Sequence, residues 1–366
     1  MPFSILQVEK FAYLCSVVGE QHEVCAPYEV IETMAQQHIR KIQHLSFLLV
    51  CLIVWLHSTP CDEHGSLPFV FRVTGVTNAL GQSAVPFFFF VSGFLFFLSY
   101  DPGSAAGKLR RRFRSLVVPY LLWNLLAAVG WLVVEALLGA VYVEPCSRYE
   151  GVDGFFYLFL DSGHLSVFWY VRNLIVYAFL SPVAYYAIRQ RYIGAALVVL
   201  SAAVSISFEL PYSGLVYWLP FYLAGCWAGL HRKTFFSLQR PAMAQATLIM
   251  LWLLFFTIMV YRPNTRLILL FRLLSPWALT ILYDRLHLDV VMKSSRAGSY
   301  SFLLYALHWV PLYVLQEYLP NHFPVPTIYY VVYYLLPIVL VPTLLWFIRF
   351  LHERIPRVYG LLSGGR

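Results

Sequence analysis

The sequence predicts an all-α polytopic membrane protein with about ten transmembrane helices and with both termini in the cytoplasm. The chain is 60% hydrophobic and only 12% charged, which is too apolar for a soluble protein of 366 residues. Apolar runs of about 20 residues, enough to cross a bilayer as a helix, recur along almost the whole chain. The basic residues gather in the short stretches between these runs, as they do in multi-pass membrane proteins.

Each apolar run is expected to form one helix. Several runs contain or end at a proline, so kinked helices are expected, with neighbouring helices satisfying the freed carbonyl groups. The ten predicted segments are 43–60, 80–99, 115–141, 164–187, 192–208, 214–231, 243–261, 266–284, 299–319 and 327–350.

The distribution of basic residues predicts the orientation. With the N-terminus in the cytoplasm, 20 of the 26 Lys and Arg residues fall on the cytoplasmic side and four fall outside. The remaining two, Arg172 and Arg272, are assigned to the interior of predicted spans. This asymmetry favours cytoplasmic termini, and it explains the net charge of +8 without a nucleic-acid partner. The sequence leaves the oligomeric state open.

The chain divides into three predicted parts. Residues 1–40 form an N-terminal cytoplasmic segment, residues 41–352 form the ten-helix membrane domain, and residues 353–366 form a cytoplasmic tail. The first 40 residues have neither the basic start nor the clean cleavage site of a signal peptide, so none is expected. No internal repeat is apparent.

The six cysteines show no metal-ligand spacing, and no metal is expected. Cys61 and Cys146 fall in loops predicted to lie outside the cell. A disulfide between them and two separate thiols are both compatible with that location.

His57 is the first candidate for chemistry, because it ends the apolar stretch "FLLVCLIVWLHS". Sixteen positions separate it from Lys41, about 24 Å of helix, which places the imidazole in the outer half of the first span. A histidine at this depth is a functional candidate, since a neutral imidazole can act as a general base. The alternative is a ring that bonds the last helix carbonyls and reaches water.

A cluster of basic residues precedes the third span in "KLRRRFRSLVVPYLLWN". It is typical of a topology anchor. Arg111, Arg112 and Arg114 also offer planar guanidinium groups that suit phosphate oxygens, as a nucleotide-containing cosubstrate requires. In "VPFFFFVSGFLFF", Ser92 and Gly93 are small residues that usually allow close helix packing.

Further polar residues lie inside predicted spans. Arg172 and Asn173 follow Trp169 in "FWYVRNL", near the outer end of the fourth span. An aromatic belt with a snorkelling arginine explains Trp169 and Arg172 but explains Asn173 less well. Glu135 is a candidate partner for Arg172. His308, in "YSFLLYALHWVP", is either a packing histidine or an active one.

Five stretches, in order, resemble the membrane acyltransferase 3 family, whose bacterial members acylate surface glycans from acyl-CoA. "IQHLSFLLVCLIVWLHS" is similar to the family's first helix, which ends in its histidine, and "VPFFFFVSGFLFF" is similar to its "PLFFxxSGYLFF" helix. "RRFRSLVVPYLLWN", "FWYVRNL" and "YSFLLYALH" are similar to its "KRxKxLLxPYxxW", "WFLRxL" and "SFxIYxxH" segments. The resemblance covers roughly residues 40 to 350.

The resemblance implies a multi-pass enzyme of the bacterial cytoplasmic membrane. It implies acetyl-CoA or another acyl-CoA as donor and a glycan or lipid-linked saccharide as acceptor. His57 would be the base or acyl carrier, with Arg172 and Asn173 as catalytic candidates. The arginine cluster would bind the cofactor with Ser92 and Gly93, and acceptor specificity would lie in outer loops such as 61–79 and 142–163.

One position departs from the family pattern. Members usually carry a basic residue eleven positions before the histidine, where this sequence has Ser46. Either Arg40 and Lys41 substitute for it, or acyl-donor handling is altered, or activity is lost. Ser46 therefore leaves open an inactive membrane scaffold. Ten spans with proline-interrupted helices and buried arginines would also suit a transporter or flippase for a glycan or lipid-linked sugar.

Overall fold

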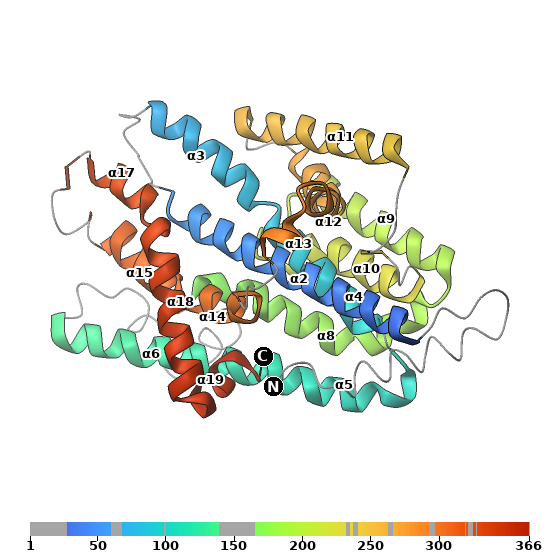
Figure 1. Ribbon diagram of the computed structural model, residues 1–366, viewed down its shortest axis with the longest axis horizontal. Coiled ribbons are helices and arrows are strands. Elements are labelled where there is room, and N and C mark those ends of the chain that lie inside the picture. The colour runs from blue at the N-terminus through green and yellow to red at the C-terminus, as the bar shows by residue number, and fades with distance from the viewer. Residues whose placement is uncertain are drawn as a thin grey trace. The chain divides into compact units, whose positions relative to one another are not determined.

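Helices form every regular element in the part of the chain that the structure describes. The computed structural model describes residues 28–59, 68–98, 100–138, 165–231, 235–236, 241–262, 266–292, 297–318, 320, 325–326 and 328–365. Within these ranges no strand occurs, and Figure 1 shows the helices. The predicted all-α class is confirmed.

Each of the ten segments predicted to cross the membrane contains helix. The α-helices are α2 (Tyr28–His57), α3 (Pro68–Gly81), α4 (Ala84–Phe97), α5 (Ala105–Arg112), α6 (Val118–Leu138), α8 (Trp169–Ile188), α9 (Arg191–Ser207), α10 (Leu215–His231), α11 (Ala242–Tyr261), α12 (Ile268–Arg285), α13 (Leu288–Val291), α14 (Ser301–Leu307), α15 (Trp309–Tyr313), α17 (Ile328–Leu335), α18 (Pro337–Arg354) and α19 (Pro356–Ser363). Short 3₁₀ turns form η1 (Pro102–Ser104), η4 (Ser166–Phe168) and η5 (Ala297–Tyr300), and π-helical turns form η2 (Phe113–Val117) and η6 (Val314–Tyr318).

Several of these helices are suited to a bilayer. Among the described residues, five are long and apolar enough to cross it, and a sixth results if α17 and α18, which meet at a bend of 41°, form one span. The other predicted spans are shorter or more polar: α9 and α10 have 17 residues each, and α12 carries three charged residues. The helices therefore support a membrane protein, while the count of ten and the sides of the termini stay predictions.

Two segments differ from the loops expected there. The predicted outer loop 61–79 is helical from Pro68 onward as α3, because its sequence is apolar and begins with a proline at the first helical position. The predicted tail after residue 352 continues α18 to Arg354 and then forms α19. Cys61, Cys146 and the loop 142–163 lie outside the described residues.

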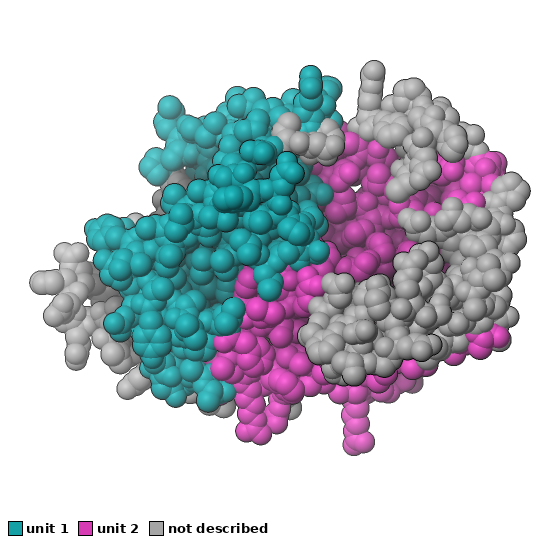
Figure 2. Space-filling view, turned by 180° about the vertical axis from the view of Figure 1, so that it is seen from behind, with its two compact units in different colours: residues 1–49, 82–106, 180–299 teal, residues 50–81, 107–179, 300–366 magenta. Residues whose placement is uncertain are grey.

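The chain groups into two compact units, coloured teal and magenta in Figure 2. Unit 1 comprises Met1–Leu49, Gln82–Ala106 and Leu180–Ser299. Unit 2 comprises Val50–Gly81, Gly107–Phe179 and Tyr300–Arg366. Helices α2 and α8 each contribute residues to both units.

Close packing of α4 on α10 forms the centre of unit 1. A β-carbon added at Gly93 would overlap the carbonyl oxygen of Tyr222 and lie 2.9 Å from the backbone nitrogen of Cys226. A β-carbon at Gly225 would overlap the carbonyl oxygen of Phe90. The two backbones therefore touch, as small residues allow between membrane helices.

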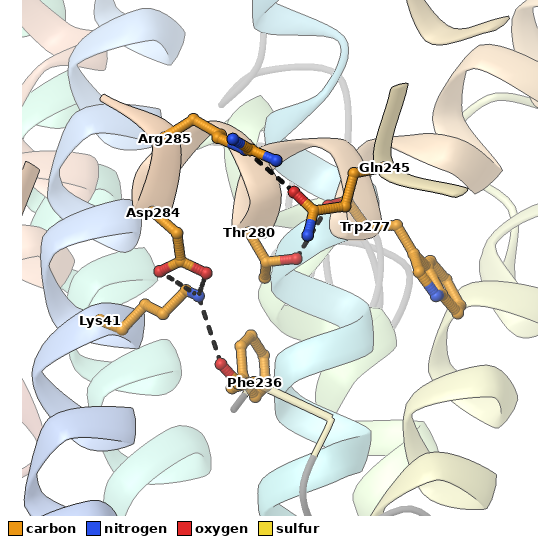
Figure 3. A network of polar contacts seen from close by, with 7 residues as sticks. All are labelled: Lys41, Phe236, Gln245, Trp277, Thr280, Asp284 and Arg285. Atoms are coloured by element: carbon orange, nitrogen blue, oxygen red, sulfur yellow. Dashed lines mark hydrogen bonds and ion pairs between the residues drawn. The ribbon is translucent and has the colours of Figure 1, made fainter. Parts of the chain in front are cut away.

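A buried lysine joins α2 to α12 in unit 1 (Figure 3). The ammonium group of Lys41 lies 2.7 and 2.6 Å from the two carboxylate oxygens of Asp284, and it donates to the carbonyl oxygen of Phe236 at 3.2 Å. The Lys41 side chain is 7% exposed, whereas that of Asp284 is 63% exposed. Three residues after Lys41 in α2, His44 Nδ1 lies 2.8 Å from the hydroxyl of Tyr283, the residue before Asp284.

Replacing Asp284 with asparagine is expected to lower the thermal midpoint of unfolding in detergent, because the buried Lys41 ammonium loses its charged partner. The coupling is expected to be about 1–2 kcal/mol, since water screens the exposed side of the pair. A double-mutant cycle with Lys41→Met measures it. If Asp284→Asn costs the same with and without Lys41→Met, the ion pair does not stabilise the unit.

The C-terminal helix holds unit 2 together. Helix α19 packs against α6 and α14, and the indole nitrogen of Trp123 donates to the carbonyl oxygen of Leu362 at 3.1 Å. Gly364 then turns the chain with φ of 70°, and a β-carbon there would lie 2.6 Å from the carbonyl oxygen of Ser115. The left-handed conformation and the lack of space both favour glycine. Helix α19 thereby supports the start of α6, next to the arginine-rich α5 and η2.

Candidate functional site

Two histidines from distant parts of the sequence lie together in unit 2. His57 is the last residue of α2, and His308 lies at the junction of α14 and α15. Their ring centroids are 5.4 Å apart with an interplanar angle of 35°. The indole ring of Trp309 meets the His57 ring edge-on at 5.0 Å. The structure thus brings together the two histidines that the sequence singled out.

The hydrogen bond of His308 shows which of its ring nitrogens carries the proton. The side chain is fully buried, and Nδ1 lies 2.6 Å from the carbonyl oxygen of Tyr305. Because a carbonyl only accepts, Nδ1 carries the proton, and Nε2 of the neutral ring keeps its lone pair. Nε2 is buried and has no hydrogen-bond partner among the described residues. Buried polar atoms are nearly always paired, so this unpaired acceptor makes His308 a candidate for a functional role.

A stack of aromatic rings supports His308. The ring of Tyr305 stacks on Phe168 at 5.7 Å, and Phe168 stacks on Tyr120 at 6.1 Å. The hydroxyl of Tyr305 donates to the carbonyl oxygen of Val167. This stack joins three of the segments that carry motifs: "PYLLWN" in α6, "FWYVRNL" at the start of α8, and "YSFLLYALH" in α14.

The end of α2 is held by groups that the sequence did not indicate. The hydroxyl of Tyr333 donates to the carbonyl oxygen of His57 at 2.8 Å and lies 3.2 Å from Oε1 of Gln316. The amide nitrogen of Gln316 donates to the carbonyl oxygen of Thr59 at 3.2 Å. These bonds fix the backbone at the end of α2 and use no atom of the His57 ring. No sequence signal distinguishes Tyr333 from the other 25 tyrosines.

The side chains of Arg172 and Asn173 are hydrogen-bonded to each other in α8. Nε of Arg172 donates to Oδ1 of Asn173 at 3.3 Å, and Asn173 is fully buried. Trp169 lies edge-on to Tyr170, which lies edge-on to Tyr305 of the aromatic stack. Glu135 belongs to α6, but its side chain lies outside the described part, so its predicted pairing with Arg172 stays a prediction.

The cationic cluster lies where α5 passes into the π-helical turn η2. Arg111 and Arg114 are exposed, and Arg112 is partly exposed. A π-helical turn widens the helix by one residue, so side chains on either side of it point in directions that a regular helix does not allow. These guanidinium groups are accessible to an anion from solution.

Ser92, Gly93 and Lys41 lie in unit 1. Gly93 contacts α10 as described above, which is the packing role that small residues predict. Ser46, at the family's basic position, is half-buried. The ammonium group of Lys41 is already paired with Asp284, so it has a structural partner of its own. In the described part of the chain, no three His, Cys, Asp or Glu side chains gather as a metal site would need.

Comparison with known families agrees with the motifs. A family model described as an acyltransferase domain matches residues 39–347, most of the chain, including both histidines and the arginine cluster. No curated protein and no solved structure is significantly similar to this chain. The chain therefore belongs to the membrane acyltransferase 3 family.

Proposed function

We propose that this protein is an integral-membrane O-acyltransferase that moves an acyl group, most simply acetyl, from acyl-CoA to a hydroxyl of a cell-surface or lipid-linked glycan. The family supports acyl transfer in general, and the apolar helices support a membrane location. We further propose acyl-CoA as the donor, a saccharide as the acceptor and the bacterial cytoplasmic membrane as the location. The observation that carries it is the contact of His57 with His308 among the family's motif segments.

His57 is proposed as the reacting group and His308 as the residue that positions it. Two imidazoles joined by an N–H···N hydrogen bond have centroids about 5 Å apart, close to the separation of this pair. A small rotation of the His57 ring would let its N–H donate to Nε2 of His308. The other nitrogen of His57 then presents its lone pair to the substrate. His308 would thus orient His57 as the acid of a catalytic triad orients the triad's histidine.

The chemistry follows from a neutral imidazole at that position. In direct transfer, His57 takes the proton from the acceptor hydroxyl, the oxygen forms a bond to the thioester carbon, and the carbon–sulfur bond breaks. The leaving thiolate of CoA then receives the proton from His57. In the covalent route, a nitrogen of His57 forms a bond to the thioester carbon, the carbon–sulfur bond breaks, and CoA leaves as its thiolate. The acceptor oxygen then bonds to the acyl carbon, the carbon–nitrogen bond breaks, and the freed nitrogen of His57 takes the hydroxyl proton and passes it to the thiolate.

Charged and amide groups would assist at two places. The cluster of Arg111, Arg112 and Arg114 would hold the phosphates of CoA through charge-assisted hydrogen bonds. Arg172 and Asn173 would donate to the oxyanion that forms at the thioester carbonyl. Ser92 and Gly93 are also candidates for contact with the cofactor, although the packing of Gly93 on α10 gives Gly93 a structural role.

Release of CoA that requires both this protein and an added acceptor tests the proposed function. The purified full chain in nanodiscs is given acetyl-CoA, free thiol is followed by a thiol reagent, and the acylated saccharide is identified by mass spectrometry. Acceptor candidates come from surface glycans of cells with and without the gene. Uptake of a saccharide into vesicles with no acetyl-CoA consumed would identify a carrier and contradict the proposal.

His308→Gln and His308→Leu are expected to separate positioning from structure. Glutamine retains an acceptor for the His57 N–H, whereas leucine does not. We expect His308→Leu to lower kcat about 10- to 100-fold with KM for acyl-CoA little changed, and His308→Gln to recover part of that loss. His352→Gln is the matched control, because His352 is also in unit 2 but bonds the hydroxyl of Tyr300. Equal losses for glutamine and leucine would rule out positioning through Nε2.

A further inference from the structure

A buried arginine in unit 1 lies among aromatic rings, far in sequence from the motifs. Arg272, five residues into α12, is 2% exposed. One terminal nitrogen of its guanidinium donates to the hydroxyl of Tyr217, and the other donates to Oε1 of Gln82. We call Arg272, Gln82, Tyr212, Tyr217 and Trp218 the Arg272 cluster.

Three aromatic rings surround the guanidinium. Its central carbon lies 5.1 Å from the ring centroid of Tyr212, 5.4 Å from that of Tyr217 and 5.1 Å from that of Trp218. The indole nitrogen of Trp218 donates to the carbonyl oxygen of Tyr212 at 2.5 Å, which fixes the two rings relative to each other. Cation–π attraction stabilises a desolvated cation, but it supplies no negative charge.

Among the residues that the structure describes, no carboxylate balances the charge of Arg272. In the described part of the chain, the ion pairs are Lys41 with Asp284, Arg266 with Glu209, and Arg349 with Glu353, and none involves Arg272. Nε of Arg272 is buried and finds no partner among the described residues. A buried cation without a counter-ion is costly, so a group that supplies an anion stabilises this state.

The rim of the cluster is accessible. Tyr212 is 42% exposed, and Gln82 and Tyr217 are partly exposed. Gln82 lies in the short turn before α4, and its Oε1 accepts from the hydroxyl of Tyr212 at 3.4 Å as well as from Arg272. The amide oxygen of Gln82 occupies the position that the oxygen of a bound carboxylate or phosphate would take.

We infer that the Arg272 cluster is a binding site for an oxyanion, a carboxylate or phosphate group whose oxygens replace the amide oxygen of Gln82 on the guanidinium. A planar guanidinium is the side chain best suited to these groups. A phospholipid headgroup and an acidic group on a saccharide both present this chemistry. The inference does not depend on His57 or on acyl transfer, and binding can be measured in an inactive preparation.

Thermal unfolding of the purified full chain in neutral detergent tests the site. The probes are phosphatidylglycerol, with phosphatidylcholine as the neutral lipid, inorganic phosphate, and glucuronate. We expect a saturable rise in the midpoint of about 4 °C or more with at least one anionic probe. A response to phosphatidylglycerol alone identifies a lipid headgroup, a response to glucuronate a saccharide carboxylate, and a response to phosphate a small-anion site.

Arg272→Gln is expected to abolish this rise, while Arg285→Gln retains it. Arg285 is the matched control because it lies on the same helix, is exposed, and likewise donates to a glutamine, Gln245. Two results would overturn the inference: an absence of response to every anionic probe in the unmodified protein, or an equal response in the Arg272→Gln variant.

Gln82→Glu provides an independent test should Arg272→Gln fail to fold. A glutamate there supplies the missing carboxylate from within the chain, so the midpoint is expected to rise without any probe and the response to anions to disappear. Gln245→Glu beside the exposed Arg285 is the control and is expected to change little, because water screens that pair. If Gln82→Glu lowers the midpoint and leaves the anion response intact, Arg272 needs no counter-ion and the inference is wrong.

Discussion

Replacing His57 with alanine is expected to reduce acyl transfer by about 10²- to 10⁴-fold while leaving the protein folded in the membrane. The ring is the only part of His57 that the proposed chemistry uses. The end of α2 is held through the carbonyl oxygen of His57, which accepts from Tyr333, and alanine keeps that carbonyl. Loss of the imidazole therefore removes the base or acyl carrier without removing its anchor.

The measurement compares acceptor-dependent CoA release and the thermal midpoint of unfolding for the two proteins. His231→Ala is the control, because His231 also ends a helix but its Nε2 bonds the carbonyl oxygen of Ile188 in unit 1. We expect His231→Ala to retain transfer. Full activity in the His57→Ala variant would end the assignment of His57 as the reacting group.

Replacing Gly225 with alanine is expected to have the largest effect on stability. The added methyl group would overlap the carbonyl oxygen of Phe90, and it would lie 2.8 Å from the carbonyl carbon of that residue. Both are backbone atoms and cannot rotate away, so α4 and α10 must separate. Overpacking a core costs about 1–3 kcal/mol where side chains adjust, and we expect at least that here.

The yield of monodisperse protein and its thermal midpoint in detergent measure this effect. Gly130→Ala is the matched control, since Gly130 also lies inside a helix but has open space where the methyl group would go. Alanine there is expected to be neutral or slightly stabilising, because it favours helix more than glycine does. A midpoint for Gly225→Ala equal to that of Gly130→Ala would show that α4 and α10 do not touch through their backbones.

Most of the helices could be predicted from the sequence, and so could the reacting groups that we propose. Long apolar runs lead to helices, because a helix satisfies its own backbone hydrogen bonds in any apolar surroundings. The motif segments with His57 and His308 pointed to the family that the comparison then confirmed. The predicted loop before residue 80 was wrong, because the apolar segment after Pro68 is too short to be recognised as a span and still forms α3.

The contacts between helices could not be predicted from the sequence. Helices such as α4 and α8 are apolar on nearly every side, so periodicity does not show which face meets which neighbour. The hydrogen bond between Arg172 and Asn173 joins adjacent residues, and no spacing rule selects such a contact. The partner of Lys41 is a carboxylate at the far end of α12.

By itself, the sequence determined that this chain forms apolar helices and belongs to an acyltransferase family. Only the tertiary structure decided that the ring of His57 meets His308, that Tyr333 holds the end of α2, and that Arg272 lies among aromatic rings. The reason is physical: helix formation depends on local backbone bonds, whereas these contacts depend on how the side chains of separate helices pack.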